Sequence, residues 1–398
     1  MNNVNINNSG RRGMGTLQKL RNQFRSGRKR RHLQKESERY QTIFLSRGLS
    51  VPGEAEISAR IATRFPGRTP KAKGDLHILA IYHSYNWEGP SLGPSLAAFG
   101  EVKHLDWRDP ELAAGKQPGD AGWKEAMNAG LLQSAKAWAA ERPFDAIFAY
   151  LSGEQVNADI LEKLRSLGAP MVNLALNDKE TFVGRRRNGH AAGARDICRY
   201  FDLCWTSTMD ALEKYVVEGA TPFYLPEGAN PAIHRPYDED KVYDVSFVGQ
   251  CYGNRPEIIG RLHEAGVRVE AFGPGWPSGP LTMEEMVRTW SRSRINLGFG
   301  GVLGHKETYC LKGRDFEVPM SGGLYLTEHH EELVPFYDIG REIVTYTGFD
   351  DLLGKIRWLL SDPDQAETIR RAGRARALRE HTWEMRFDRV FRLLGALT

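Results

Sequence analysis

Short, almost continuous runs of apolar residues recur along the first half of the chain and alternate with stretches of helical character. Such runs are typical of strands that are buried on both faces of a parallel sheet. They predict strands near residues 76–82, 102–105, 144–150, 171–174 and 203–206, with helices over 95–99, 122–140 and 158–167. This alternation predicts a doubly wound α/β domain.

The second half repeats the pattern after a stretch rich in proline and charge, residues 222–241, which we interpret as a hinge. Strands are predicted near 243–249, 267–273, 294–299 and 323–327, and helices over 255–266, 350–360 and 365–381. A chain of 398 residues suits two domains. We expect an extension over 1–70, sheet domains over 71–235 and 236–380, and a C-terminal helix over 381–398, with a return to the first domain as one option.

Composition narrows the class of protein. The chain is 41% hydrophobic and 26% charged, which is typical of a soluble globular protein. Its apolar runs are shorter than the roughly 20 residues of a membrane helix, and no apolar core follows the basic start as in a secretory signal. The four cysteines form no C-x-x-C pair, so we interpret them as reduced thiols and expect a cytoplasmic protein.

The net charge of +4 conceals a basic N-terminal tail. Residues 1–35 hold ten Arg and Lys residues and no Asp or Glu, so the rest of the chain carries 44 basic and 50 acidic groups. We interpret the tail as a solvated, partly disordered extension, with the Asn-rich residues 1–8 at its start and a basic helix over about 17–40. Recruitment of an anionic surface or nucleic acid through residues 11–35, or a transit peptide, is the alternative.

Candidate chemistry follows the strands of the second half. Gly249 ends a predicted strand, and Arg255 opens the helix after the turn. A helix N-terminus beside a guanidinium is a natural diphosphate site, although glycine turns and surface arginines are also common.

The stronger signal is the segment 311–327. Lys312, Arg314 and Glu317 occur within six residues and precede Gly322-Gly323 and an apolar strand. A surface ion pair between Arg314 and Glu317 would also explain this spacing. Two cations beside a glycine turn are nevertheless suited to phosphates, and a carboxylate is suited to ribose hydroxyls.

The first half offers fewer candidates. His83 follows the first strand, and Asp178 follows the strand near 171–174. Each is a candidate base or acceptor contact, and an ordinary loop histidine and turn aspartate are the alternatives. Arg185-Arg186-Arg187 and His190 form a basic loop that would suit an anionic acceptor, or simply a solvated loop.

At this point the chain resembles the CgeB-like, group 1 glycosyltransferases, whose donor domain is GT4-like. The resemblance rests on the order of Ser246-Phe247-Val248-Gly249, Arg255, Phe272-Gly273, Lys312-x-Arg314-x-Phe316-Glu317, Gly322-Gly323 and Leu378–Trp383. It implies a GT-B fold, in which two Rossmann-like doubly wound domains face a central cleft.

The resemblance also implies a function. It predicts transfer of a sugar from a nucleotide-diphosphate sugar, with a UDP-sugar favoured, to an acceptor hydroxyl with retained configuration. Glu317 matches the second glutamate of the family's E-x7-E pattern, which grips the ribose, and Gly249, Gly273, Gly322 and Gly323 match its glycines. Arg255, Lys312 and Arg314 become the diphosphate partners. Tyr309 replaces the first glutamate, which leaves an inactive sugar-nucleotide- or polymer-binding protein as an alternative.

We predict no cofactor beyond this co-substrate and no essential metal. The only D-x-D is Asp238-Glu239-Asp240, in the presumed hinge. The sequence does not distinguish between a glycan, a protein, a small molecule and modified nucleic acid as the acceptor.

Overall fold

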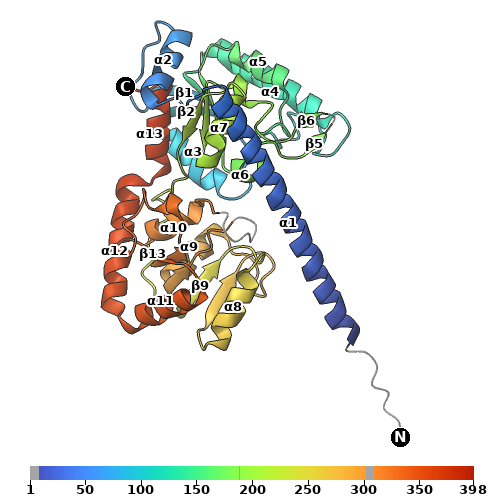
Figure 1. Ribbon diagram of the computed structural model, residues 1–398. Coiled ribbons are helices and arrows are strands. Elements are labelled where there is room, and N and C mark those ends of the chain that lie inside the picture. The colour runs from blue at the N-terminus through green and yellow to red at the C-terminus, as the bar shows by residue number, and fades with distance from the viewer. Residues whose placement is uncertain (1–8, 188, 302–308) are drawn as a thin grey trace.

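The computed structural model describes residues 9–187, 189–301 and 309–398, and it contains two α/β units stacked along the long axis of the molecule (Figure 1). The Asn-rich start, residues 1–8, lies outside the described residues. The first unit has a six-stranded sheet in the order β2-β1-β3-β4-β7-β8, and the second has a five-stranded sheet in the order β10-β9-β11-β12-β13. Neighbouring strands in both sheets are parallel, so the predicted pair of doubly wound domains is confirmed.

The first sheet consists of β1 (Leu76–Ile81), β2 (Gly100–Leu105), β3 (Ala146–Ala149), β4 (Met171–Ala175), β7 (Leu203–Thr206) and β8 (Pro222–Tyr224). Its connections hold α3 (Glu88–Ala97), α4 (Trp123–Glu141), α5 (Ala158–Arg165), α6 (Asp178–Thr181), α7 (Leu212–Val217) and a small hairpin of β5 (Arg186–Arg187) and β6 (His190–Ala191). Every residue of β1 is buried, as expected for a central strand covered on both faces.

Two sequence predictions for this unit were wrong in detail. Helix α3 begins at Glu88 rather than near Ser95, because Pro90 falls in its first turn, where a missing N–H costs no helical hydrogen bond. The predicted hinge was also too long, since Pro222 opens strand β8. Proline is tolerated there because β8 is an edge strand and Pro222 is its first residue.

The second sheet consists of β9 (Tyr243–Val248), β10 (Val269–Phe272), β11 (Ser293–Leu297), β12 (Tyr325–Glu328) and β13 (Val344–Tyr346). Helices α8 (Arg255–Glu264), α9 (Met283–Ser291), α10 (Gly313–Met320), α11 (Phe349–Ser361) and α12 (Pro363–Glu380) cover it. In each sheet the chain order reverses beside the first strand of the unit, between β1 and β3 and between β9 and β11. Ligands of such folds bind beyond the carboxyl ends of the strands at these switch points.

The last helix, α13 (Trp383–Leu393), crosses back to the first unit (Figure 1). Its rings pack in the core of that unit, where Phe387 lies against Phe148 and Trp205 at centroid distances of 5.2 and 5.6 Å. The chain therefore passes between the units twice, near Glu227–Lys241 and near His381–Trp383. The two crossings pair through a parallel bridge between Ala229 and Thr382.

The N-terminal segment forms α1 (Ser9–Ser46) and α2 (Glu54–Arg64), and the expected basic helix is part of α1. The C-terminal half of α1 lies on the first unit, while its N-terminal half extends away from the body (Figure 1). Tyr40 is buried and meets Phe182 edge to face, and its hydroxyl donates to Glu218 at 2.5 Å. Lys214 pairs with Glu36 at 2.9 Å. These contacts fix the C-terminal half of the helix on α7.

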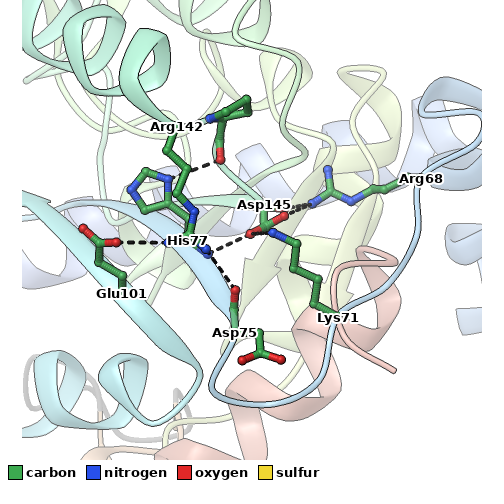
Figure 2. Close-up of polar contacts among 8 residues, drawn as sticks. Arg68, Lys71, Asp75, His77, Glu101, Arg142 and Asp145 are labelled. Atoms are coloured by element: carbon green, nitrogen blue, oxygen red, sulfur yellow. Dashed lines mark hydrogen bonds and ion pairs between the residues drawn. The ribbon is translucent and has the colours of Figure 1, made fainter.

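A polar cluster lies at the amino ends of the strands of the first sheet (Figure 2). The Asp145 carboxylate accepts hydrogen bonds from the backbone N–H of His77 at 2.8 Å and from Lys71 Nζ at 2.7 Å. Arg68 donates to the Asp145 carbonyl. The cluster ties the incoming linker to β1 and lies far from the carboxyl ends of the strands, so we assign it to the fold rather than to a site.

Candidate functional site

Two glycine loops meet at the carboxyl ends of β9 and β10. Gly273 has a φ of +127°, and a side chain there would approach the carbonyl oxygen of Gly249 to 2.4 Å. Gly249 donates its N–H to the Phe272 carbonyl at 2.8 Å, and its own carbonyl accepts from Trp276 Nε1 at 2.8 Å. Glycine is required because the loops touch through their backbones. The result is a low, fixed rim at the switch point of the second sheet.

Arg255 lies at the start of α8, after the turn that follows β9. Its side chain is buried, its guanidinium lies 4.1 Å from the Tyr252 ring, and Nη1 donates to the Gln250 carbonyl at 2.9 Å. Burial lowers the pKa of Arg255, and the charge of Arg314 lowers it further. The guanidinium is therefore held in one orientation beside the loop that follows β9.

Lys312 occupies the corresponding place before α10, beside the end of β11. Its ammonium donates to the carbonyls of Phe299 and Gly301, at 3.0 Å each. Burial lowers the pKa of Lys312, and the charges of Arg255 and Arg314 act in the same direction. Asp315 accepts from the Lys312 backbone N–H at 2.7 Å and from the Tyr325 hydroxyl at 2.8 Å, which fixes the first turn of α10.

Arg314 completes a group of three cations, the donor cations Arg255, Lys312 and Arg314. Within the described ranges its half-buried side chain makes neither a hydrogen bond nor an ion pair, and the ion pair with Glu317 considered from the sequence does not form. The charge of Arg314 lowers the pKa of both Arg255 and Lys312, so the three cations lie close enough to act on one another. Such an arrangement is suited to a polyanion such as a diphosphate.

Two carboxyls face each other next to these cations. Gly313 separates them: a side chain at this position would begin 2.9 Å from Glu227 Oε2 and 3.0 Å from Glu317 Oε1. Burial, together with the nearby charge of Glu317, raises the pKa of Glu227 to about 8. His234 is buried with Nε2 at 3.7 Å from Glu317, and its Nδ1 accepts from the Asn230 N–H. Burial lowers the pKa of His234, so a neutral ring faces Glu317.

Sequence reasoning did not single out Glu227, His234 and Gly313. Glu227 lies in the crossing after β8, and Glu317 lies in α10, so only the fold brings them together. No local spacing in the sequence links Glu227 to Glu317, because 90 residues separate them.

The first unit has its own cavity at the switch point between β1 and β3, with a volume of about 270 Å³. We call it the switch-point cavity, and its lining includes His83, Tyr85, Trp107, Tyr150 and Asp178. His83 follows β1, and its Nδ1 lies 2.8 and 2.9 Å from the two carboxylate oxygens of Asp106 at the end of β2. The Tyr85 and Trp107 rings lie 4.3 and 5.2 Å from the His83 ring. A carboxylate that holds one ring nitrogen leaves the other available for a hydroxyl group.

Asp178 also lines this cavity, but its surroundings favour a structural role. It is buried, and its Oδ2 accepts hydrogen bonds from Thr206 at 2.8 Å and from Tyr215 at 2.7 Å. Burial raises the pKa of Asp178, and the two hydroxyls oppose this effect. To accept a proton at Oδ2, the carboxylate would have to give up one of these bonds. These bonds give Asp178 a structural role through Oδ2, while Oδ1 has no hydrogen bond with the described residues, so the catalytic role expected from the sequence stays a prediction.

Gly322 and Gly323 lie at the far end of α10 from Lys312. Gly322 has a φ of +72° and ends the helix, and its carbonyl accepts from Arg370 Nη1 at 2.9 Å. A side chain at Gly323 would begin 2.7 Å from Asn296 Nδ2. These glycines follow the cations closely in the chain, and that spacing predicts a shared phosphate site. A full helix separates them, and their small size serves the turn into β12.

Tyr309, at the position where the resemblance would place a glutamate, lies at the boundary between the units. Its ring stacks on His330 with the centroids 5.6 Å apart, and its carbonyl accepts from Lys179. Lys179 belongs to the first unit and also pairs with Glu332 of the second at 2.9 Å. Burial lowers the pKa of His330 to about 4, so the ring is neutral near pH 7. An aromatic pair thus occupies the place where a carboxylate was expected.

The remaining chemistry is limited. Over the described parts of the chain, no group of three or more His, Cys, Asp or Glu residues is placed to hold a metal ion. Glu239 of the D-x-D segment pairs with Arg288 and Arg292. The four cysteines are free thiols. No described helix has the length and apolarity needed to cross a bilayer.

Comparisons with known proteins agree with this architecture. Residues 255–392 match a family model described as glycosyl transferase-like, and this range includes the three donor cations and Glu317. A search of curated proteins found no relative by sequence.

Two solved structures are similar in fold. Sucrose-phosphate synthase from Thermosynechococcus elongatus has a TM-score of 0.58 at 13% identity, over 81% of this chain and 100% of that chain. Anabaena HepE, solved in complex with UDP and glucose, has a TM-score of 0.54 at 10% identity, also over 81% of this chain and 100% of that chain. The fold is therefore GT-B, as the resemblance implied.

Proposed function

We propose that the protein is a glycosyltransferase that moves a sugar from a nucleotide-diphosphate sugar to an acceptor hydroxyl. The observation that carries this proposal is the gathering of Arg255, Lys312 and Arg314 with the Glu317 carboxylate near the starts of α8 and α10, beside the switch point of the second sheet. The match of residues 255–392 to the glycosyl transferase-like model supports it. HepE was solved with UDP and glucose, which supports a UDP-sugar as the donor.

In this proposal the second domain holds the donor. Glu317 accepts hydrogen bonds from the ribose hydroxyls, and Glu227 faces the same position across Gly313. The diphosphate lies against Arg255, Lys312 and Arg314, below the rim that Gly249 and Gly273 form. Three cations supply the neutralisation that a divalent metal provides in other transferases, so we propose that transfer needs no essential metal.

The reaction breaks the bond between the anomeric carbon and the diphosphate oxygen, and the acceptor oxygen bonds to the same carbon. Negative charge grows on the leaving diphosphate, where the donor cations stabilise it. In the retaining course that the family resemblance implies, a leaving phosphate oxygen takes the acceptor proton. His83, held by Asp106, orients the acceptor hydroxyl in the switch-point cavity.

The His83–Asp106 pair would also suit an inverting mechanism. A histidine whose Nδ1 is fixed by a carboxylate is suited to take the acceptor proton itself, which would permit direct displacement and inversion. The anomeric configuration of the product, read by NMR after transfer from a UDP-α-sugar, decides between the two courses. An α-product supports retention, and a β-product assigns the base role to His83.

A second candidate function is binding without transfer. The Tyr309–His330 stack stands where the family has a glutamate that contacts the donor sugar, and this observation favours a protein that holds a sugar nucleotide or a polymer. Slow hydrolysis of UDP-, GDP- and TDP-sugars separates the candidates. Turnover supports the enzyme, while tight binding with complete inertness supports the binder.

The acceptor is assigned only as a hydroxyl of a glycan, a protein, a small molecule or modified nucleic acid. Loss of the basic tail tests the last of these. If removal of residues 1–35 leaves salt-dependent DNA binding unchanged, the tail does not recruit a nucleic acid. A cytoplasmic location and a CgeB-like subfamily also stay predictions from the sequence.

The experiment that tests the proposed function is titration of UDP and of uridine into the wild type and Glu317→Gln. The amide keeps the size of the side chain but accepts fewer and weaker hydrogen bonds, so both ligands should bind roughly tenfold or more weakly. Glu264→Gln, on the exposed face of α8, is the matched control and should bind like the wild type. Equal UDP affinity in Glu317→Gln and the wild type would refute the donor site.

A further inference from the structure

A second cavity lies between α1 and the first domain. Its volume is about 780 Å³, and we call it the α1 groove. One wall is the face of α1 that carries His32, Lys35 and Arg39, continued by Arg47 just after the helix. The other wall is the segment 183–199, which contributes Arg186, Arg195 and Arg199. The positive charge of either wall alone would be ordinary for a protein surface. The docking of α1 through Tyr40 and Lys214 makes the two sets of cations face each other.

The carboxylates of the groove are already engaged. Glu36 pairs with Lys214 at 2.9 Å, and Glu218 accepts from the Tyr40 hydroxyl at 2.5 Å. Arg195 pairs with Asp196 at 2.6 Å. The other cations of the lining have no ion pair with any residue that the structure describes, and these are Lys35, Arg39, Arg47, Arg186 and Arg199. The groove therefore has an excess of positive charge that the described protein does not neutralise.

The groove adjoins the switch-point cavity. Thr181, Gly193 and Ala194 line that cavity, while Val183 and Gly184 line the groove, so one segment forms the wall of both. The wall is thin because its two strands of chain touch through glycines. A side chain at Gly193 would begin 1.8 Å from the Thr181 carbonyl oxygen, and one at Gly184 would begin 3.0 Å from the Gly193 nitrogen.

The shape of the groove indicates the kind of ligand. Its volume lies within the range of roughly 300–1,000 Å³ found for pockets that hold small molecules. The unpaired cations are exposed, but they line both walls of one groove, whereas a flat bilayer or a duplex would need them on one outward face. Four of its five unpaired cations are arginines, whose planar forks bind phosphate oxygens in pairs.

We propose that the α1 groove binds the phosphate-bearing part of the acceptor, so that the acceptor is an anionic, phosphorylated molecule. This inference rests on the proposed function, because only a glycosyltransferase has an acceptor. Binding of phosphate in the groove can nevertheless be tested independently of that function. In this proposal the acceptor reaches over the rim of the shared wall, with the hydroxyl to be glycosylated in the switch-point cavity and the phosphate groups in the groove. In this proposal α1 forms one of the two walls of the phosphate site.

The test is calorimetric titration of inorganic tripolyphosphate into the full chain, with and without saturating UDP. UDP occupies the donor cations, which would otherwise bind the probe as well. The groove variant is Arg39→Gln/Arg186→Gln/Arg199→Gln, and the control is Arg268→Gln/Arg341→Gln/Arg379→Gln, which removes the same charge from exposed positions elsewhere. In the presence of UDP we expect the groove variant to bind the probe at least about tenfold more weakly than the wild type, and the control to match the wild type.

Several outcomes would overturn the inference. Equal affinity of the groove variant and the wild type would remove the groove as a phosphate site. Binding to vesicles with anionic phospholipid, or to duplex DNA, that is lost in the groove variant while tripolyphosphate does not bind, would assign the surface to a membrane or a nucleic acid instead. Failure of UDP to bind would refute the donor site alone, because the difference between the groove variant and its control would persist.

Discussion

The raised pKa of Glu227 makes a quantitative prediction for Glu227→Gln. In the folded protein the carboxyl has a pKa of about 8 because of burial and of Glu317, against 4.5 for an unperturbed glutamate. A carboxyl with a raised folded-state pKa favours the folded state in its protonated form. That contribution is fully present below pH 4.5 and is lost as the pH rises to 8. The difference between the two pKa values corresponds to about 5 kcal/mol of unfolding free energy.

The amide of Glu227→Gln resembles the protonated carboxyl at every pH, so it removes this dependence. We expect the variant and the wild type to be equally stable near pH 4.5. The variant should become more stable by up to about 5 kcal/mol at pH 9. Urea unfolding at pH 4.5, 7 and 9 measures the difference, and Glu264→Gln on the surface of α8 is the control. A difference that stays constant from pH 4.5 to 9 would refute the argument that the two carboxyls share a desolvated site.

Three further predictions concern the donor site, the switch-point cavity and the returning helix. Lys312→Met keeps the buried stem but removes the ammonium, so UDP should bind roughly tenfold more weakly while uridine binds as before, and equal losses for both would contradict a diphosphate role. Asp106→Asn should lower turnover roughly 10- to 100-fold with unchanged UDP affinity, because His83 loses its anchor, and Asp109→Asn should not. Phe387→Ala should destabilise the first domain by about 3–5 kcal/mol in urea unfolding, while Met385→Ala, exposed on the same helix, should change stability by less than about 1 kcal/mol.

The sheets could be predicted from the sequence because buried parallel strands leave continuous apolar runs. Strand β1 is an example, since all of its residues are buried and all were in a predicted strand. The sequence pattern does not predict helices that form only because of the exact positions of their prolines. Helix α3 contains Pro90 in its first turn, where no helical N–H is needed, and Pro94 inside it, where one helical hydrogen bond is lost. The Pro90 carbonyl, which Pro94 leaves free, accepts instead from Asn230 Nδ2 at 3.2 Å.

The candidate site was predictable only where its residues are neighbours in the chain. Lys312, Arg314 and Glu317 lie within two turns of α10, so their spacing was informative. Gly322 is also near in sequence, but the same helix carries it to the other end of the domain. Asp106 and Glu227 could not be found in this way, because each meets its partner across a strand crossover. Neither apolar periodicity nor local spacing records such a meeting.

The position of Glu227 connects the donor site to the boundary between the domains. Its backbone carbonyl accepts from Arg386 of α13, and Ala229, two residues later, pairs with the second crossing at His381 and Trp383. Glu227 is therefore tied to the crossings, whereas Glu317 belongs to α10 of the second domain. Any change in the angle between the domains would change the separation of the two carboxyls. A ribose that hydrogen-bonds both of them would hold the nucleotide and also fix that angle, which links donor binding to the alignment of the switch-point cavity with the donor cations.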